Sequence, residues 1–236
     1  MDERLIPILQ RHRFHSVVSF DRQKDKLLRF DFTSNNRELS ASILDDTQRF
    51  TRYINDKLNA SHAKFGVGGY NEYRELYSRS RVFDSAHNDE EPRRLHLGID
   101  IWGKAYNRVM SPLDAIVHSF GFNNKYGDYG ATLLLTHNLE GCSFHTLYGH
   151  LSLNSIKNLR EGGNIKSGDV IGEFGIPMEN GQWPPHLHFQ IIKELGEWKG
   201  DYPGVCKYSE GDIYLNNCPD PDLILGMMDY ARQLLP

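Results

Sequence analysis

Short runs of β-forming residues, separated by glycines, dominate the middle of this 236-residue chain. β-branched and aromatic residues in stretches of a few positions are typical of strands. The runs fall at residues 116–117, 132–136, 143–151, 170–174 and 187–192. Glycine recurs between them, and tight turns accept glycine readily. The pattern predicts an antiparallel sheet, sandwich or barrel-like core.

The first 90 residues mix helix and strand patterns and read as an N-terminal extension. Residues 16–20 and 27–32 are expected to form strands. Apolar residues at four-residue spacing after a run of capping residues predict a helix over residues 46–60. Aromatic residues gather over residues 70–83. That stretch fits either core packing or the wall of a substrate groove.

Residues 91–236 are expected to form the second domain, which ends in a long loop at 196–219 and a helix. Asp220 at the N-cap and Pro221 at the first helical position are a good start for that helix. The whole chain is therefore predicted to be mainly β with flanking helices, an α+β fold. The apolar face of the final helix would consist of Ile224, Met228, Ala231 and Leu235.

Composition excludes several classes of partner. A formal net charge of -4 and the lack of a basic stretch argue against nucleic acid or an anionic membrane. No apolar run is long enough to span a bilayer, and the first residues lack the apolar region of a signal peptide, so a cytoplasmic location is expected. Cys142, Cys206 and Cys218 fit reduced thiols, with one disulfide plus a free thiol left open. The pattern leaves the oligomeric state open.

Two histidines stand two positions apart in the last β-like run. In a strand, alternate side chains share a face, so His186 and His188 would project together. Leu187, Phe189 and Ile191 would project from the opposite face. On its own, such a pair is also typical of solvated or hydrogen-bonded strand histidines.

A second stretch makes a metal site the stronger interpretation. His96 and Asp100 are four positions apart, which puts both on one face of a strand, and the apolar residues around Gly98 favour a strand. With His188 they would offer a divalent cation two nitrogens and one carboxylate oxygen. Three protein ligands with a fourth position open to water are the pattern of a catalytic zinc site.

A third stretch, residues 144–152, would place Thr146, Tyr148 and His150 on one face of a strand. Taken together, the three stretches resemble the lysostaphin-like (LytM-type) zinc metallopeptidases over roughly residues 95–192. A turn-and-strand segment of the family is also matched at residues 163–172. The motifs that carry the resemblance are, in chain order, His96-x-Gly98-x-Asp100, Tyr148-x-His150-Leu151 and His186-Leu187-His188-Phe189.

The resemblance implies a role for each matched residue. His96, Asp100 and His188 take the positions of the ligands to one zinc ion, and His150 and His186 take two non-ligand catalytic positions. It also implies a small antiparallel core with zinc in its groove, and endopeptidase activity on the peptide bridges of bacterial cell walls. Where the family usually has glutamate after the last motif, this chain has Gln190, which we expect to have little effect because it is not a ligand position.

The chemistry that follows is hydrolysis of an amide by zinc-activated water. Zinc lowers the pKa of its bound water to about 7 and polarises a carbonyl. The chain lacks the His-Glu-x-x-His helix whose glutamate is the base in other zinc peptidases, and histidine titrates in the right range to replace it. We expect His186 to orient or deprotonate the water, and His150 to stabilise the oxyanion or protonate the leaving amine. Tyr148 could add a hydrogen bond or simply pack in a strand.

Three alternatives stay open on the sequence alone. The chain could be a non-catalytic zinc-binding or activator module of the same fold. It could hold a structural zinc, which needs a fourth protein ligand such as His150 or a cysteine. It could also be a cytosolic amide hydrolase that acts on a small peptide. The neighbouring His137 and His145 are expected to lie outside the catalytic set.

Overall fold

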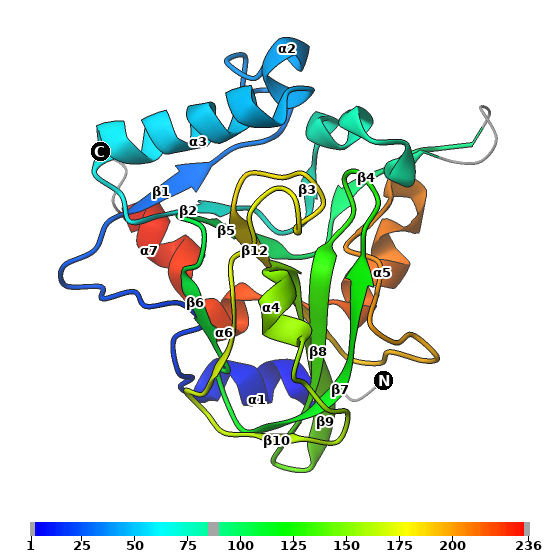
Figure 1. The fold of residues 1–236 in the computed structure, drawn as a ribbon. Coiled ribbons are helices and arrows are strands. Elements are labelled where there is room, and N and C mark those ends of the chain that lie inside the picture. Colours follow the sequence, from blue (N-terminus) through cyan, green and yellow to red (C-terminus); the bar gives the residue numbers. More distant parts are fainter. Residues whose placement is uncertain (1–2, 85–89, 234–236) are drawn as a thin grey trace.

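The computed structural model describes residues 3–84 and 90–233 and is built around one large sheet (Figure 1). Its strands are β1 (Leu27–Phe30), β2 (Phe65–Gly68), β5 (Ile99–Trp102), β7 (Ala115–Asn123), β8 (Gly130–Leu139), β9 (Cys142–Leu151), β10 (Asn164–Ile165) and β12 (His186–Ile192). They are ordered β1-β2-β5-β12-β9-β8-β7-β10. The pair β1–β2 is parallel, and the other neighbours are antiparallel. The predicted mainly β fold with flanking helices is confirmed.

Two smaller sheets accompany the large one. The first has the order β13-β4-β3, from β3 (Glu72–Tyr73), β4 (Arg93–His96) and β13 (Val205–Lys207). The second pairs β6 (Arg108–Met110) with β11 (Val170–Glu173). Leu97 and Gly98 are the residues between β4 and β5. His96 therefore ends β4 in the small sheet, whereas Asp100 lies in β5 of the large sheet. The prediction that one strand carries both residues is wrong, because the chain changes sheets at Leu97 and Gly98.

Helices cover the edges of this β framework. The predicted helix at 46–60 is confirmed: α3 (Thr47–Ser61) begins where the Asp46 carboxylate accepts two backbone N–H groups of its first turn. Its residues Phe50, Ile54 and Leu58 are buried in one cluster with Phe30 of β1 and Phe32 just after it. The helical segments are α1 (Leu5–Arg11), α2 (Ala41–Leu44), α3 (Thr47–Ser61), η1 (Glu75–Arg79), η2 (Arg81–Phe83), α4 (Leu153–Ile156), η3 (Tyr208–Glu210), α5 (Gly211–Asn217), α6 (Asp222–Leu225) and α7 (Met227–Gln233).

The central strand β12 is buried on both faces, and its alternation separates apolar from polar side chains. Leu187, Phe189 and Ile191 enter the main apolar cluster on one side of the sheet, as predicted. His186 and His188 are also buried, and they lie opposite residues of β5 on the other side. Burial of imidazoles in the middle of a sheet requires polar partners, so this face is where a site is expected.

The segment before residue 91 contributes strands to the sheet that carries these histidines. β2 pairs with β5 so that Gly66 lies opposite Trp102 and Gly68 lies opposite Asp100. β1 extends the same sheet beyond β2. The division of the chain near residue 90 stays a prediction, but β1 and β2 show that the extension is built into the framework of the site.

Three local predictions are wrong, each because tertiary contacts decide the structure. Residues 16–20 form an isolated bridge at Val18 instead of a strand. Residues 196–219 contain β13, η3 and α5 instead of a long loop, because β13 pairs with β4, which is distant in sequence. The final helix is split into α6 and α7 by Gly226, whose φ of 56° is left-handed. α6 begins at Asp222 with Pro221 at its N-cap, one position later than predicted, and the predicted apolar position Leu235 lies outside the described residues. No helix in the described ranges has the length and apolar character needed to cross a membrane.

Candidate metal centre

Strand register brings two of the predicted ligands face to face. In the antiparallel pair of β12 and β5, His188 lies directly opposite Asp100. On its other side His188 lies opposite Gly149 of β9. Directly opposite residues project from the same face of a sheet, so the imidazole and the carboxylate meet there. The missing side chain at Gly149 leaves room that the Tyr129 ring occupies, since a Cβ there would lie 2.4 Å from that ring.

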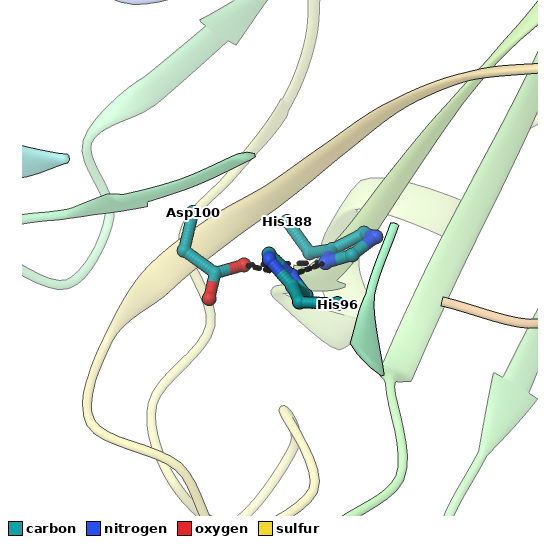
Figure 2. Close-up of side chains that lie close together, drawn as sticks. All are labelled: His96, Asp100 and His188. Carbon is teal, nitrogen blue, oxygen red and sulfur yellow. Dashed lines mark hydrogen bonds and ion pairs between the residues drawn. The ribbon is translucent and has the colours of Figure 1, made fainter. Parts of the chain in front are cut away.

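The third predicted ligand, His96, reaches the same point from the end of β4 (Figure 2). Its Nε2 lies 3.0 Å from His188 Nδ1 and 3.3 Å from Asp100 Oδ1. His188 Nδ1 lies 3.2 Å from the same carboxylate oxygen. The three atoms therefore form a nearly equilateral triangle, and all three side chains are buried.

Hydrogen bonding fixes which imidazole nitrogens carry lone pairs. His96 Nδ1–H donates to the Gly69 carbonyl at 2.9 Å, which leaves a lone pair on Nε2. His188 Nε2–H donates to Gln190 Oε1 at 2.9 Å, which leaves a lone pair on Nδ1. In the neutral imidazoles, then, two lone pairs and a carboxylate oxygen point at one another with no proton between them. Such a set of acceptors is suited to bind a cation.

The triangle fits zinc in size as well as in chemistry. A tetrahedral zinc with bonds of about 2.0–2.1 Å to nitrogen and oxygen has ligand–ligand edges of about 3.3–3.4 Å. The observed separations of 3.0, 3.2 and 3.3 Å are close to these edges. Three nitrogen and oxygen donors that leave a fourth position open are the donor set of a catalytic zinc site.

The local electrostatics set the protonation states of the proposed ligands. Burial, followed by the charge of Arg74, lowers the pKa of His96 to about 4, so its imidazole is neutral at pH 7. Burial opposes ionisation of Asp100, but the polar groups around it, foremost His96 and the charged Arg74, hold the pKa of that carboxyl well below its usual value. The site therefore offers a neutral nitrogen on His96 and an ionised oxygen on Asp100, the protonation states that metal binding needs.

Gln190 lies beside the proposed ligands and contacts His188. Its Nε2 donates to the Pro203 carbonyl and to Cys218 Sγ, which turns its Oε1 toward His188. The expectation that Gln190 has little effect stays a prediction, but Gln190 shares the face of His188 and its hydrogen bond favours the His188 tautomer with the proton on Nε2. The available signal was its position, since a residue two places after His188 in a strand shares its face.

The two other predicted histidines lie beside the trio. The rings of His150 and His186 are 4.1 Å apart, and the His186 ring stacks on Trp102 at 3.9 Å. His186 Nδ1–H donates to the Pro184 carbonyl, and His150 Nδ1–H donates to the Asn180 carbonyl. Each therefore keeps a lone pair on Nε2. Burial is the largest cause that lowers both pKa values, that of His186 to about 4, so both rings are neutral at pH 7.

His150 reaches the site by a departure from regular strand geometry. Its φ of 61° is left-handed, and the pairing of β8 with β9 is bulged between Ala131 and Leu133. Tyr148, two residues earlier, lies opposite Phe189 and packs in the main core. The prediction that Tyr148 and His150 share a face is therefore wrong, and the structure places Tyr148 outside the site.

A pocket of about 570 Å³ opens onto the two histidines and reaches Asp100 and His188. The aromatic-rich stretch at 70–83 forms one part of the pocket wall. The groove-wall interpretation therefore holds for those members of the stretch that line the pocket. Arg74 from the same stretch also lines the pocket, and no motif in the sequence pointed to it. The members of the stretch that line the pocket are Arg74, Leu76, Tyr77, Arg81, Val82 and Phe83.

Gly98 is expected to be indispensable for metal binding. A Cβ at this position would lie 2.5 Å from Cε1 and 2.6 Å from Nε2 of His188, and 2.8 Å from the Phe189 carbonyl oxygen. Gly98→Ala should therefore displace the His188 ring and weaken zinc binding about tenfold or more, as measured by competition with a chelating indicator. Gly211→Ala is the matched control, because Gly211 lies in α5 and a Cβ there would meet only the end of the Leu95 side chain, at 3.0 Å. Unchanged zinc affinity in folded Gly98→Ala would contradict this account of the site.

Comparison with known proteins supports the resemblance carried by the three motifs. Residues 94–200 match the sequence model of peptidase family M23, which confirms the predicted resemblance to the lysostaphin-like (LytM-type) peptidases. An L-Ala–D-Glu endopeptidase of Bacillus subtilis (strain 168) is 30% identical over 139 residues. That match covers 56% of this chain and 38% of the relative, so the chain spans well under half of the relative's length.

Solved structures similar to this chain include two peptidases. A zinc-containing peptidase from Vibrio cholerae is 25% identical, with a TM-score of 0.34, over 46% of this chain and 30% of that chain. Lysostaphin from Staphylococcus simulans is 22% identical, with a TM-score of 0.41, over 71% of this chain and 53% of that chain.

Proposed function

We propose that this chain is a zinc-dependent metallo-endopeptidase that hydrolyses a bond in a peptide or a peptidoglycan-type substrate. The observation that carries the proposal is the triangle of His96 Nε2, Asp100 Oδ1 and His188 Nδ1, with sides of 3.0–3.3 Å. These residues would hold one zinc ion, and His150 and His186 would be the catalytic groups beside it. The peptidase family of residues 94–200 supports the reaction type.

When bound, zinc would acidify a water molecule and polarise the scissile carbonyl. His150 and His186 would handle the protons. Because the Nδ1–H of each ring is committed to a backbone carbonyl, each neutral ring presents only a lone pair at Nε2. Either ring can therefore accept the proton of the attacking water, and the ring that has taken it up can donate it to the leaving amine.

The substrate class is supported by the pocket and by the relative. The pocket is large enough for several residues of a peptide, and its wall carries charges of both signs. The similar Bacillus subtilis protein is an L-Ala–D-Glu endopeptidase, which makes a short wall-type peptide the first substrate to test. The charged residues of the wall include Arg81, Arg93, Lys125, Asp128 and Asp201.

Hydrolysis of defined peptides tests this proposal. The zinc-loaded chain is incubated with wall-derived and glycine-rich peptides, and mass spectrometry identifies the bond that is cut. We expect cleavage that stops when a chelator removes the metal and returns when one equivalent of zinc is restored. Cleavage that persists without metal, or a zinc-loaded chain that cuts none of the peptides, would contradict the proposal.

A further inference from the structure

A buried arginine from outside the matched peptidase segment contacts one of the proposed ligands. Arg74 lies between β3 and η1, and its side chain is fully buried. Its Nη1 donates to Asp100 Oδ2 at 2.5 Å, and its Nε donates to Glu72 at 2.6 Å. The oxygen Oδ2 of Asp100 therefore has a protein partner, whereas Oδ1 is the oxygen that faces His96 and His188.

The surroundings of Arg74 hold its guanidinium in one place. The ring of Phe32 lies 5.2 Å from the guanidinium carbon, and the Tyr77 hydroxyl lies 3.3 Å from Nη1. Gly68 leaves the space that the guanidinium fills, since a Cβ there would lie 2.9 Å from Nη2. A buried charge persists only where pairing and hydrogen bonds replace its water, and Arg74 has both.

The same segment also holds a second proposed ligand. The Gly69 carbonyl accepts the Nδ1–H of His96 at 2.9 Å and so leaves Nε2 free to bind metal. Residues 69–77 thus supply the hydrogen-bond partners of two of the three proposed ligands. This segment precedes residue 94, where the family match begins.

We infer that Arg74 is a positioning residue that makes Asp100 a one-oxygen ligand, and that residues 69–77 are an integral part of the metal site. The inference rests on the proposed function in one respect, that a metal binds at the trio. A carboxylate can bind a metal through one or both oxygens. By occupying Oδ2, Arg74 leaves Oδ1 as the ligand atom, and a coordination position stays open for substrate.

Metal binding by the full chain tests the inference without an activity assay. Zinc affinity is measured by competition with a chelating indicator, and coordination is followed by the visible absorption of the cobalt-substituted protein. We expect Arg74→Met to weaken zinc binding about 10–100-fold and to change the cobalt spectrum. Arg74→Lys should recover part of the affinity, because lysine keeps the charge but not the planar fork of donors.

Two further variants separate positioning from folding. Arg79→Met makes the same chemical change nearby in the chain. Arg79 donates hydrogen bonds to Tyr126 and Thr47 instead of Asp100, so this variant should keep the zinc affinity of the wild type. If Arg74→Met unfolds because Glu72 is left unpaired, the double variant Glu72→Gln/Arg74→Met removes both charges and should show the same loss of affinity.

The outcomes distinguish the inference from the proposed function. Wild-type affinity and an unchanged cobalt spectrum in Arg74→Met, or in the double variant, would overturn the inference alone. An equal loss of affinity in Arg79→Met would also overturn it, because loosening the segment would then explain the effect. A wild-type chain that binds no zinc would overturn the proposed function together with the inference.

Discussion

His188→Ala is expected to purify without zinc and to lose peptidase activity. His188 contributes one corner of the triangle, and strand pairing on both sides holds it in register with β5 and β9. Loss of a hydrogen-bond partner of a ligand typically costs 10–100-fold in metal affinity, so loss of the ligand itself should cost more than about 100-fold. Zinc content measured by elemental analysis, together with peptide cleavage, checks both parts of this expectation.

His145→Ala is the matched control for that experiment. His145 lies on the neighbouring strand β9, where it is paired opposite Ile192 and hydrogen-bonds with Thr136 Oγ1. It makes no recorded contact with the trio, so its variant should keep zinc and activity. A His188→Ala chain that retains one zinc per molecule would show that the metal binds elsewhere.

His186→Ala is expected to separate binding from chemistry, keeping zinc while losing activity. His186 lies beside the trio and presents a neutral Nε2 to the pocket, but its nitrogens contact no proposed ligand. General acid–base groups typically contribute 10²–10⁴-fold, so kcat should fall by about that factor. His150→Ala should behave in the same way, because its ring lies 4.1 Å from that of His186.

The double variant and a core control sharpen this second prediction. If His150 and His186 pass one proton between them, their effects should be far from additive, and the double variant should be little worse than either single variant. Tyr148→Phe removes a hydroxyl that hydrogen-bonds with Thr146 in the core, so it should affect stability more than kcat. Full activity in His186→Ala would eliminate it as a catalytic group.

Alternation along strands made most of the site predictable from the sequence. The two-residue spacing of His186 and His188 predicts a shared face, and both lie on β12 as expected. The four-residue spacing of His96 and Asp100 pointed to the right pair for the wrong reason, because they lie on two strands of different sheets and meet through the short connection between β4 and β5. Such spacing is a local property of an extended chain, which sequence alone reveals. The family resemblance then connected the three stretches.

The features that escaped prediction depend on contacts between distant parts of the chain or on local irregularity. Arg74 meets Asp100 because β3 pairs with β4 across a long stretch of sequence, and no local pattern indicates that pairing. His150 turns toward the site because its φ is left-handed, which a period-two pattern cannot anticipate. Gly226 likewise divides the predicted final helix, because its left-handed φ ends α6 before α7 begins.

X-ray absorption at the zinc K-edge of the zinc-loaded wild-type chain tests the central claim most directly, because it reports the atoms bound to the metal. The account predicts one zinc with two imidazole nitrogens and one carboxylate oxygen at about 2.0–2.1 Å, and a solvent oxygen beside them. A sulfur ligand at about 2.3 Å, or a first shell without imidazole, would contradict it.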